Sequence, residues 1–94
     1  MAQLLVKHTV KDYATFKSVY DGHAAFRKAA GSKGARLLRS SENPNEIVVL
    51  TEWDDVTKAR QFGQSPDLRE VMERAGVIGQ PGVSFLDEIE RTSA

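Results

Sequence analysis

The chain has 94 residues, enough for a single domain over residues 1–94, and its 13 basic and 13 acidic side chains cancel. No segment concentrates lysine and arginine, which argues against a nucleic-acid partner. Cysteine is absent, so the chain has no disulfide framework, thiolate nucleophile or thiolate metal site. The longest aliphatic run, Ile47 to Leu50, is too short to span a bilayer, and the N-terminus lacks a secretory pattern, so we expect a cytoplasmic protein without a membrane partner.

The first part of the chain predicts a strand followed by a long helix. Aliphatic and β-branched residues fill the segment 4–10, and the side chain of Asp12 can cap a helix that begins after it. Apolar residues then recur at three- and four-residue steps over 13–30, and Gly31 supplies a left-handed stop. We therefore expect one amphipathic helix across this range.

A hairpin and an interrupted helix are predicted next. Residues 35–39 and 46–53 have strand character, and the Asn-Pro-Asn sequence between them favours a turn. Asp54 or Asp55 can cap the helix that follows. This helix is expected to break at Gly-Gln-Ser-Pro-Asp and to restart with Ser65 as its cap and Pro66 at the first helical position.

The C-terminal part completes a known arrangement. Gly76 ends the helical region, Gly-Gln-Pro-Gly at 79–82 is predicted to be a turn, and alternating polarity over 83–90 predicts a last strand. The order βαββαβ is the ferredoxin-like α+β motif. In this motif a four-stranded antiparallel sheet carries its helices on one face, and its first and third strands lie in the centre.

The two central strands are apolar on both faces, which predicts a partner. In the first strand Leu4 and Val6 fall on one face and Leu5 on the other, and the strand over 46–53 is apolar on both faces in the same way. One face is covered by the helices, and no part of the chain remains to cover the other. We therefore expect a homodimer, with two copies packed sheet to sheet about a two-fold axis.

The segment VVLTEWDDVTKARQFGQSPDL carries a more specific pattern. It combines a Glu-Trp pair at a strand end, an acidic helix start, a small helix residue and a Ser-Pro pair, namely Glu52, Trp53, Asp55, Ala59, Ser65 and Pro66. In these features, and in the order of its elements, the chain resembles the antibiotic biosynthesis monooxygenase-like family of the dimeric α/β barrel superfamily. The resemblance implies a homodimer with a cavity between sheet and helices in each subunit.

Members of the family that this chain resembles have different activities. Some relatives oxidise aromatic polyketides or quinols without a metal or prosthetic group, and others degrade haem. Many relatives place a histidine on the second helix where this chain has Phe62, and haem-degrading relatives use a first-strand asparagine that is absent here. Haem degradation is therefore disfavoured. The Asn and Trp used by some cofactor-free oxygenases are represented only by Trp53.

His8 is the candidate catalytic residue. It shares a strand face with Leu4 and Val6, so its ring points either toward the helices or into the dimer interface. A neutral imidazole could remove a phenolic or enolic proton and generate an anion that reacts with dioxygen. The alternative is a core histidine bonded to a backbone carbonyl or a tyrosine hydroxyl. Alternation along the strand does not say which face meets the helices.

Six further side chains are candidates for ligand binding. His23 and Arg27 share the apolar arc of the first helix, where Arg27 could hold an anionic or phenolic group. Alternatively, the arginine stem covers the core while its head reaches water. Trp53 could stack on a planar ligand, although a large aromatic side chain at a strand end more often anchors a core. The full candidate set is Tyr20, His23, Arg27, Trp53, Phe62 and Met72.

Two classes of function remain open. The first is a small enzyme, related to cofactor-independent monooxygenases, that acts on a small aromatic or hydrophobic metabolite. The second is a non-catalytic homodimer that binds such a ligand or serves as an assembly module, since one fold can host many functions. No cofactor and no metal are expected, because two histidines far apart in sequence give little basis for a metal site.

Overall fold

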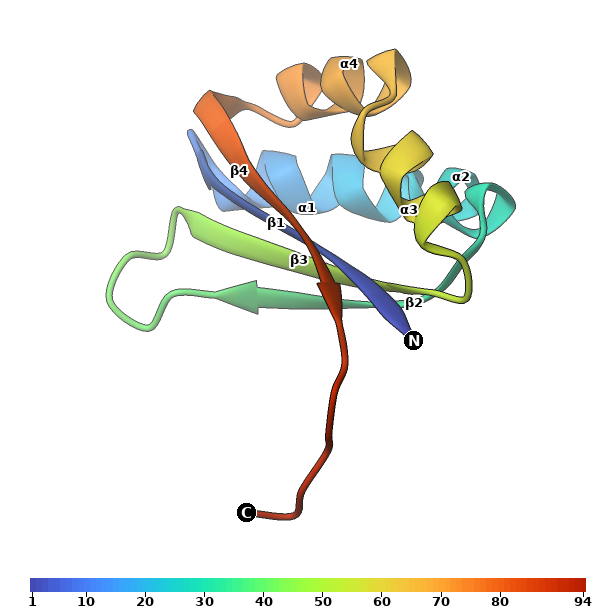
Figure 1. The fold of residues 1–94 in the computed structure, drawn as a ribbon. Coiled ribbons are helices and arrows are strands. Elements are labelled where there is room, and N and C mark those ends of the chain that lie inside the picture. Colours follow the sequence, from blue (N-terminus) through green and yellow to red (C-terminus); the bar gives the residue numbers. More distant parts are fainter.

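Eight elements follow one another along the chain in the computed structural model, which describes residues 1–94 (Figure 1). They are β1 (Ala2–Val10), α1 (Tyr13–Gly22), α2 (Ala24–Ala30), β2 (Ser32–Arg39), β3 (Glu46–Trp53), α3 (Val56–Gly63), α4 (Pro66–Arg74) and β4 (Val77–Asp87). The four strands form one antiparallel sheet in the order β2-β3-β1-β4, and the helices cover one of its faces. The ferredoxin-like prediction, with β1 and β3 in the centre, is confirmed.

Side-chain caps start the helices where the sequence predicts. The carboxylate of Asp12 accepts a hydrogen bond from the Thr15 backbone N–H at 3.0 Å, and Asp55 accepts one from Thr57 at 2.8 Å. The hydroxyl of Ser65 accepts a bond from the Leu68 N–H at 3.1 Å, and a proline opens α4. Each cap satisfies a backbone donor that the first helical turn leaves free.

The prediction of one helix over 13–30 is wrong, because the helix is interrupted at His23. This residue has φ −97° and ψ 2°, and it separates α1 from α2. The preceding Gly22 favours the break, since glycine stabilises a helix less than other residues except proline. Beyond α2, Gly31 has φ 115° and closes the helix in the left-handed conformation, as the sequence predicts.

The predicted turn at 79–82 is also wrong, because β4 runs through it. Ile78 pairs with Thr9 and Gly82 pairs with Lys7, so extra residues of β4 stand opposite the single residue His8. Gly79, at φ 72°, adopts the positive dihedral angle that lets the strand bulge and continue. The last strand is longer at its start than predicted and ends at Asp87, and Ile89 beyond it is 96% exposed.

The core lies between the sheet and the helices. Alternate residues of β1 from Ala2 to Val10 are buried on the helix face. One hydrophobic cluster includes Trp53 and Phe62, and a second is centred on Phe16 and Ile47. None of the helices is both long and apolar enough to cross a membrane.

The opposite face of the sheet carries no helix (Figure 1). We call it the open face. Strand register places Leu5 opposite Leu50, and Leu38 opposite Val48, so these apolar side chains are neighbours on it. Leu38 is 48% exposed in the single chain. The apolar residues of the open face are Leu5, Leu38, Val48, Leu50, Ile78 and Leu86.

Candidate functional site

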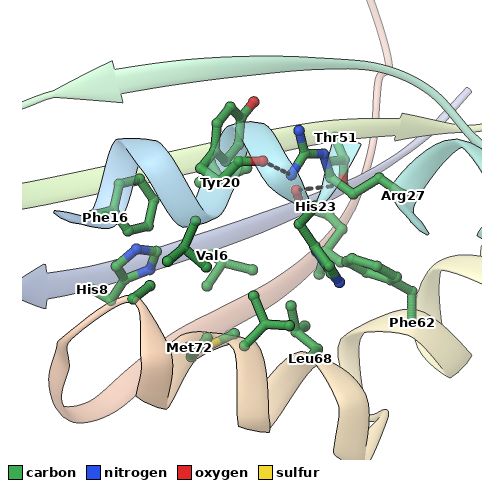
Figure 2. A pocket seen from close by; sticks show the side chains of 15 residues that line it. Val6, His8, Phe16, Tyr20, His23, Arg27, Thr51, Phe62, Leu68 and Met72 are labelled. Carbon is green, nitrogen blue, oxygen red and sulfur yellow. Dashed lines mark hydrogen bonds between the residues drawn. The ribbon is translucent and has the colours of Figure 1, made fainter. Parts of the chain in front are cut away.

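A cavity of about 60 Å³ lies between the helix face of the sheet and the helices (Figure 2). Its wall is apolar, since 11 of its 15 lining residues are hydrophobic. Figure 2 shows His8 beside Phe16 at one end of the group, while Arg27 and Phe62 lie at the other. The lining residues are Leu4, Val6, His8, Phe16, Val19, Tyr20, His23, Arg27, Val49, Thr51, Phe62, Leu68, Val71, Met72 and Ala75.

His8 projects from β1 to the helix side of the sheet, which answers the question that strand alternation leaves open. The residue is 6% exposed, and neither Nδ1 nor Nε2 has a hydrogen-bond partner. The ring centroid lies 5.1 Å from that of Phe16. The predicted alternative, a core histidine bonded to a carbonyl or a tyrosine hydroxyl, is therefore not what the structure contains. A buried imidazole with no partner is uncommon and suggests a role beyond packing.

The surroundings of His8 keep its ring neutral. Burial in an apolar environment lowers the pKa of His8 below its usual value of 6.5, because the charged form loses its hydration. The neutral ring has one N–H donor and one acceptor nitrogen. It is therefore able to accept a proton from an acidic hydroxyl or carbon acid that reaches it.

The lowered pKa predicts acid sensitivity. The folded state binds the His8 proton less readily than the unfolded state. Protonation of His8 therefore does not reduce the stability of the folded state above pH 6.5, and it reduces that stability progressively as the pH falls below this value. Replacing His8 by leucine should flatten this dependence and, at about pH 8, should leave the free energy of unfolding equal or raise it by about 1 kcal/mol. Urea unfolding at a series of pH values measures both effects. If the pH dependence of the free energy of unfolding is unchanged in His8→Leu, folding does not lower the pKa of His8.

Arg27 and Tyr20 form one side of the site at the junction of α1 and α2. The guanidinium of Arg27 lies 4.0 Å from the centroid of the Tyr20 ring, and its Nη1 donates a hydrogen bond to the Tyr20 carbonyl at 3.0 Å. Arg27 is 9% exposed and makes no ion pair with a carboxylate. Arg27 lines the cavity, and its guanidinium is held against Tyr20 instead of extending into water as the predicted alternative had it.

His23 lies at the break between the two helices and also lines the cavity. Its ring is stacked on Phe26 at 4.5 Å between centroids and lies 6.2 Å from Phe62. Burial is the main cause that lowers the pKa of His23, and the positive charges of Arg27 and Arg74 lower it further. The site therefore contains a second imidazole that favours its neutral form.

Trp53 lies in the core and does not line the cavity. It is 0% exposed, and its Nε1 donates a hydrogen bond to the Thr51 hydroxyl at 2.8 Å. Its ring lies 5.3 Å from Phe62, and both Phe62 and the bonded Thr51 line the cavity. The structure thus places Trp53 as an anchor, and the five other ligand-binding candidates, Tyr20, His23, Arg27, Phe62 and Met72, line the cavity.

Several lining residues were not among the candidates. Phe16 belongs to the apolar stripe of α1, and that stripe is a signal that could have found it. Thr51 is 2% exposed and is a polar residue on a central strand, which is also visible in the sequence. No three His, Asp or Glu side chains come together in a way that could hold a metal ion.

The sequence matches a family model. Residues 12–74 match the family described as antibiotic biosynthesis monooxygenase. This segment runs from the cap of α1 to the end of α4 and contains most of the cavity wall. No curated protein matches the sequence.

Solved structures share the fold. A protein of Bordetella bronchiseptica, named provisionally as an antibiotic biosynthesis monooxygenase, has 22% identity and a TM-score of 0.81, with 95% of this chain and 97% of that chain covered. SnoaB, a cofactor-independent oxygenase from Streptomyces nogalater, has 21% identity and a TM-score of 0.80, with 99% and 97% covered. A conserved protein of Methanosarcina mazei has 17% identity and a TM-score of 0.73, with 90% and 89% covered. From the family match and the fold together, this chain belongs to the antibiotic biosynthesis monooxygenase family.

Proposed function

We propose that the protein is a cytoplasmic homodimer whose subunits each bind a small aromatic metabolite between sheet and helices and oxidise it with dioxygen, without a cofactor. The observation that carries the proposal is the buried, neutral imidazole of His8, both of whose nitrogens lack a partner at the end of an apolar cavity. A phenol or quinol would supply the missing partner through its hydroxyl group. One solved structure with the same fold is that of a cofactor-independent oxygenase, which supports the same chemistry.

The proposed reaction needs one base and an apolar site. His8 takes a proton from an acidic C–H or O–H group of the substrate, which leaves an electron-rich carbanion or phenolate. A ring carbon of this anion gives two electrons to dioxygen as a new C–O bond forms, and the resulting peroxide anion takes the proton back from His8 to give a hydroperoxide. Loss of the hydrogen that remains on this carbon as a proton, with cleavage of the O–O bond, then releases water. A ring CH₂ in an anthrone, or a ring C–H in a phenol or quinol, has become C=O, so that one oxygen atom enters the product and the other leaves as water.

The cavity contributes selectivity and exclusion of water. Its apolar wall favours an aromatic ring over water, and it places the ring beside the imidazole. The cation of Arg27 lies over Tyr20 on the same wall, where its charge would stabilise a substrate anion. This arrangement supports an anionic intermediate within an otherwise apolar space.

Homodimerisation is part of the proposal. The open face carries apolar side chains on all four strands, and Leu38, Ile78 and Leu86 are each more than 40% exposed in the single chain. Polar side chains such as Lys7 and Arg36 lie among them, and exposed apolar side chains gathered on one face in this way are a feature of protein interfaces. Packing the two open faces together about a two-fold axis buries these residues and leaves both cavities on the outer, helix-covered sides.

A turnover measurement tests the catalytic role. Dioxygen consumption with a panel of anthrones, phenols and quinols should be detectable for the wild type, and His8→Ala should lower kcat by about two to four orders of magnitude while remaining a folded dimer. Added imidazole should restore part of the rate, which a merely structural defect would not allow. Glu70→Ala, a substitution on the exposed side of α4, serves as the matched control.

The alternative is a non-catalytic homodimer that binds a ligand or assists assembly. The volume of about 60 Å³ lies below the roughly 300 to 1,000 Å³ of pockets for drug-sized ligands, which counts against a bound small molecule in either function and so favours the assembly role within this alternative. The two functions differ in one result. If a phenol binds at the cavity of the wild type and no dioxygen is consumed with any compound of the panel, the protein is a binding module.

A further inference from the structure

A second hollow lies against the cavity on the outer side of α4. It is a groove of about 460 Å³ between α4 and β4, which we call the α4–β4 groove. Polar and apolar residues share its wall, unlike the wall of the inner cavity. The groove is lined by Gly63, Gln64, Ser65, Leu68, Arg69, Met72, Glu73, Val77, Gly79, Gln80, Pro81 and Val83.

The groove and the inner cavity have two lining side chains in common. Leu68 and Met72 line both hollows, and Figure 2 shows them on α4 beside the inner cavity. Leu68 is 9% exposed, and Met72 is half-buried. Methionine is unbranched and has three rotatable side-chain bonds, so it adapts its shape more readily than other apolar residues. Met72 is therefore the shared side chain most able to move and open a passage between the two hollows.

The bulge in β4 forms the other side of this passage. Gly79, Gln80 and Pro81 line the groove, and they are the residues that loop out opposite His8 where the β1–β4 register shifts. The bulge thus brings the groove to the level of the proposed base along β1. Bulges often occur beside functional sites, where they redirect a strand.

We infer that the α4–β4 groove is the outer half of the ligand site, which takes an aromatic ring past Met72 into the inner cavity and holds a polar, acceptor-bearing end of the same ligand outside it. This inference rests on the proposed function, since it uses the same cavity. The inner cavity of about 60 Å³ is too small for a substituted aromatic compound, whereas the groove of about 460 Å³ has the volume of an ordinary ligand pocket.

The residues of the groove select the chemistry of the outer end. Arg69 has only donor groups, and Gln64 and Gln80 each contribute an amide N–H₂ donor. Glu73 is the one carboxylate on this wall, and it disfavours a highly charged anion. The arrangement fits a ring compound with a single carboxylate or carbonyl at one end and a phenolic hydroxyl at the other. Hydroxynaphthoate is a simple probe with these features.

Amide chemical-shift mapping of the protein with hydroxynaphthoate tests the inference. We expect perturbations on β4 at Gly79 and Gln80 and on α4 from Leu68 to Glu73, together with those around His8. Met72→Trp, which fills the passage, should raise Kd by about tenfold, equivalent to about 1.4 kcal/mol. Arg69→Ala, which removes an exposed donor and leaves the core intact, should raise Kd by about threefold. Glu70→Ala, on the same helix outside the groove, should leave Kd unchanged.

The outcomes separate this inference from the proposed function. His8→Ala should bind hydroxynaphthoate within about threefold of the wild type even when its turnover is lost, because most contacts lie elsewhere. The inference is overturned by an absence of saturable binding, by perturbations confined to the α1–α2 junction, or by a Kd that neither Met72→Trp nor Arg69→Ala changes. None of these results bears on whether His8 removes a proton. An absence of turnover in the wild type, with intact groove binding, would instead count against the oxygenase.

Discussion

Replacing Trp53 by alanine should lower the free energy of unfolding by about 3 to 5 kcal/mol, the largest effect expected of any single substitution in this chain. Trp53 is fully buried, packs on Phe62 and donates a hydrogen bond to Thr51. Alanine removes these contacts and leaves a cavity between the sheet and Gly31 at the α2–β2 junction. Urea unfolding followed by circular dichroism measures the loss.

Trp53→Phe separates packing from hydrogen bonding. The phenyl ring keeps most of the buried area but loses the indole N–H, so we expect a loss of about 1 to 2 kcal/mol. A loss below about 1 kcal/mol for Trp53→Ala would show that the site collapses easily and that Trp53 is not the anchor that its burial indicates. Such a result would reopen the hypothesis that the ring serves a ligand.

Leu50→Arg should convert the proposed dimer into a monomer. Leu50 lies on the central strand β3, opposite Leu5 on one side and Arg36 on the other, and so in the middle of the open face. Each dimer would bury two added guanidinium groups without partners, and an uncompensated buried charge costs about 3 to 5 kcal/mol. Sedimentation equilibrium of the wild type and the variant measures the change in mass.

A matched control lies on the other side of the molecule. Val56 is 40% exposed at the start of α3, on the helix-covered face, and Val56→Arg should leave the dimer intact. A wild-type protein that is monomeric at high concentration, or a Leu50→Arg variant that stays dimeric, would contradict packing through the open face. In the second case another surface must form the interface.

The local chemistry of this chain is strong enough to define most of its fold. Caps at Asp12, Asp55 and Ser65 start helices through bonds to residues two or three positions away, and strand alternation follows from the pleat itself. The two wrong predictions, one continuous helix over 13–30 and a turn at 79–82, also have local explanations. The break at His23 and the bulge over residues 79–81 are local choices between two allowed conformations, and the pattern around them does not distinguish these conformations.

The candidate site shows where sequence reasoning ends. The sequence determines that His8, Tyr20, His23, Arg27, Phe62 and Met72 fall on apolar faces, because periodicity assigns each to one side of its element. Only the tertiary structure decides that β1 turns His8 toward the helices, that both of its nitrogens lack partners, and that Trp53 packs on Phe62 in the core without lining the cavity. These facts depend on contacts between residues far apart in the chain, and a periodic pattern fixes the faces of an element but not what each face meets.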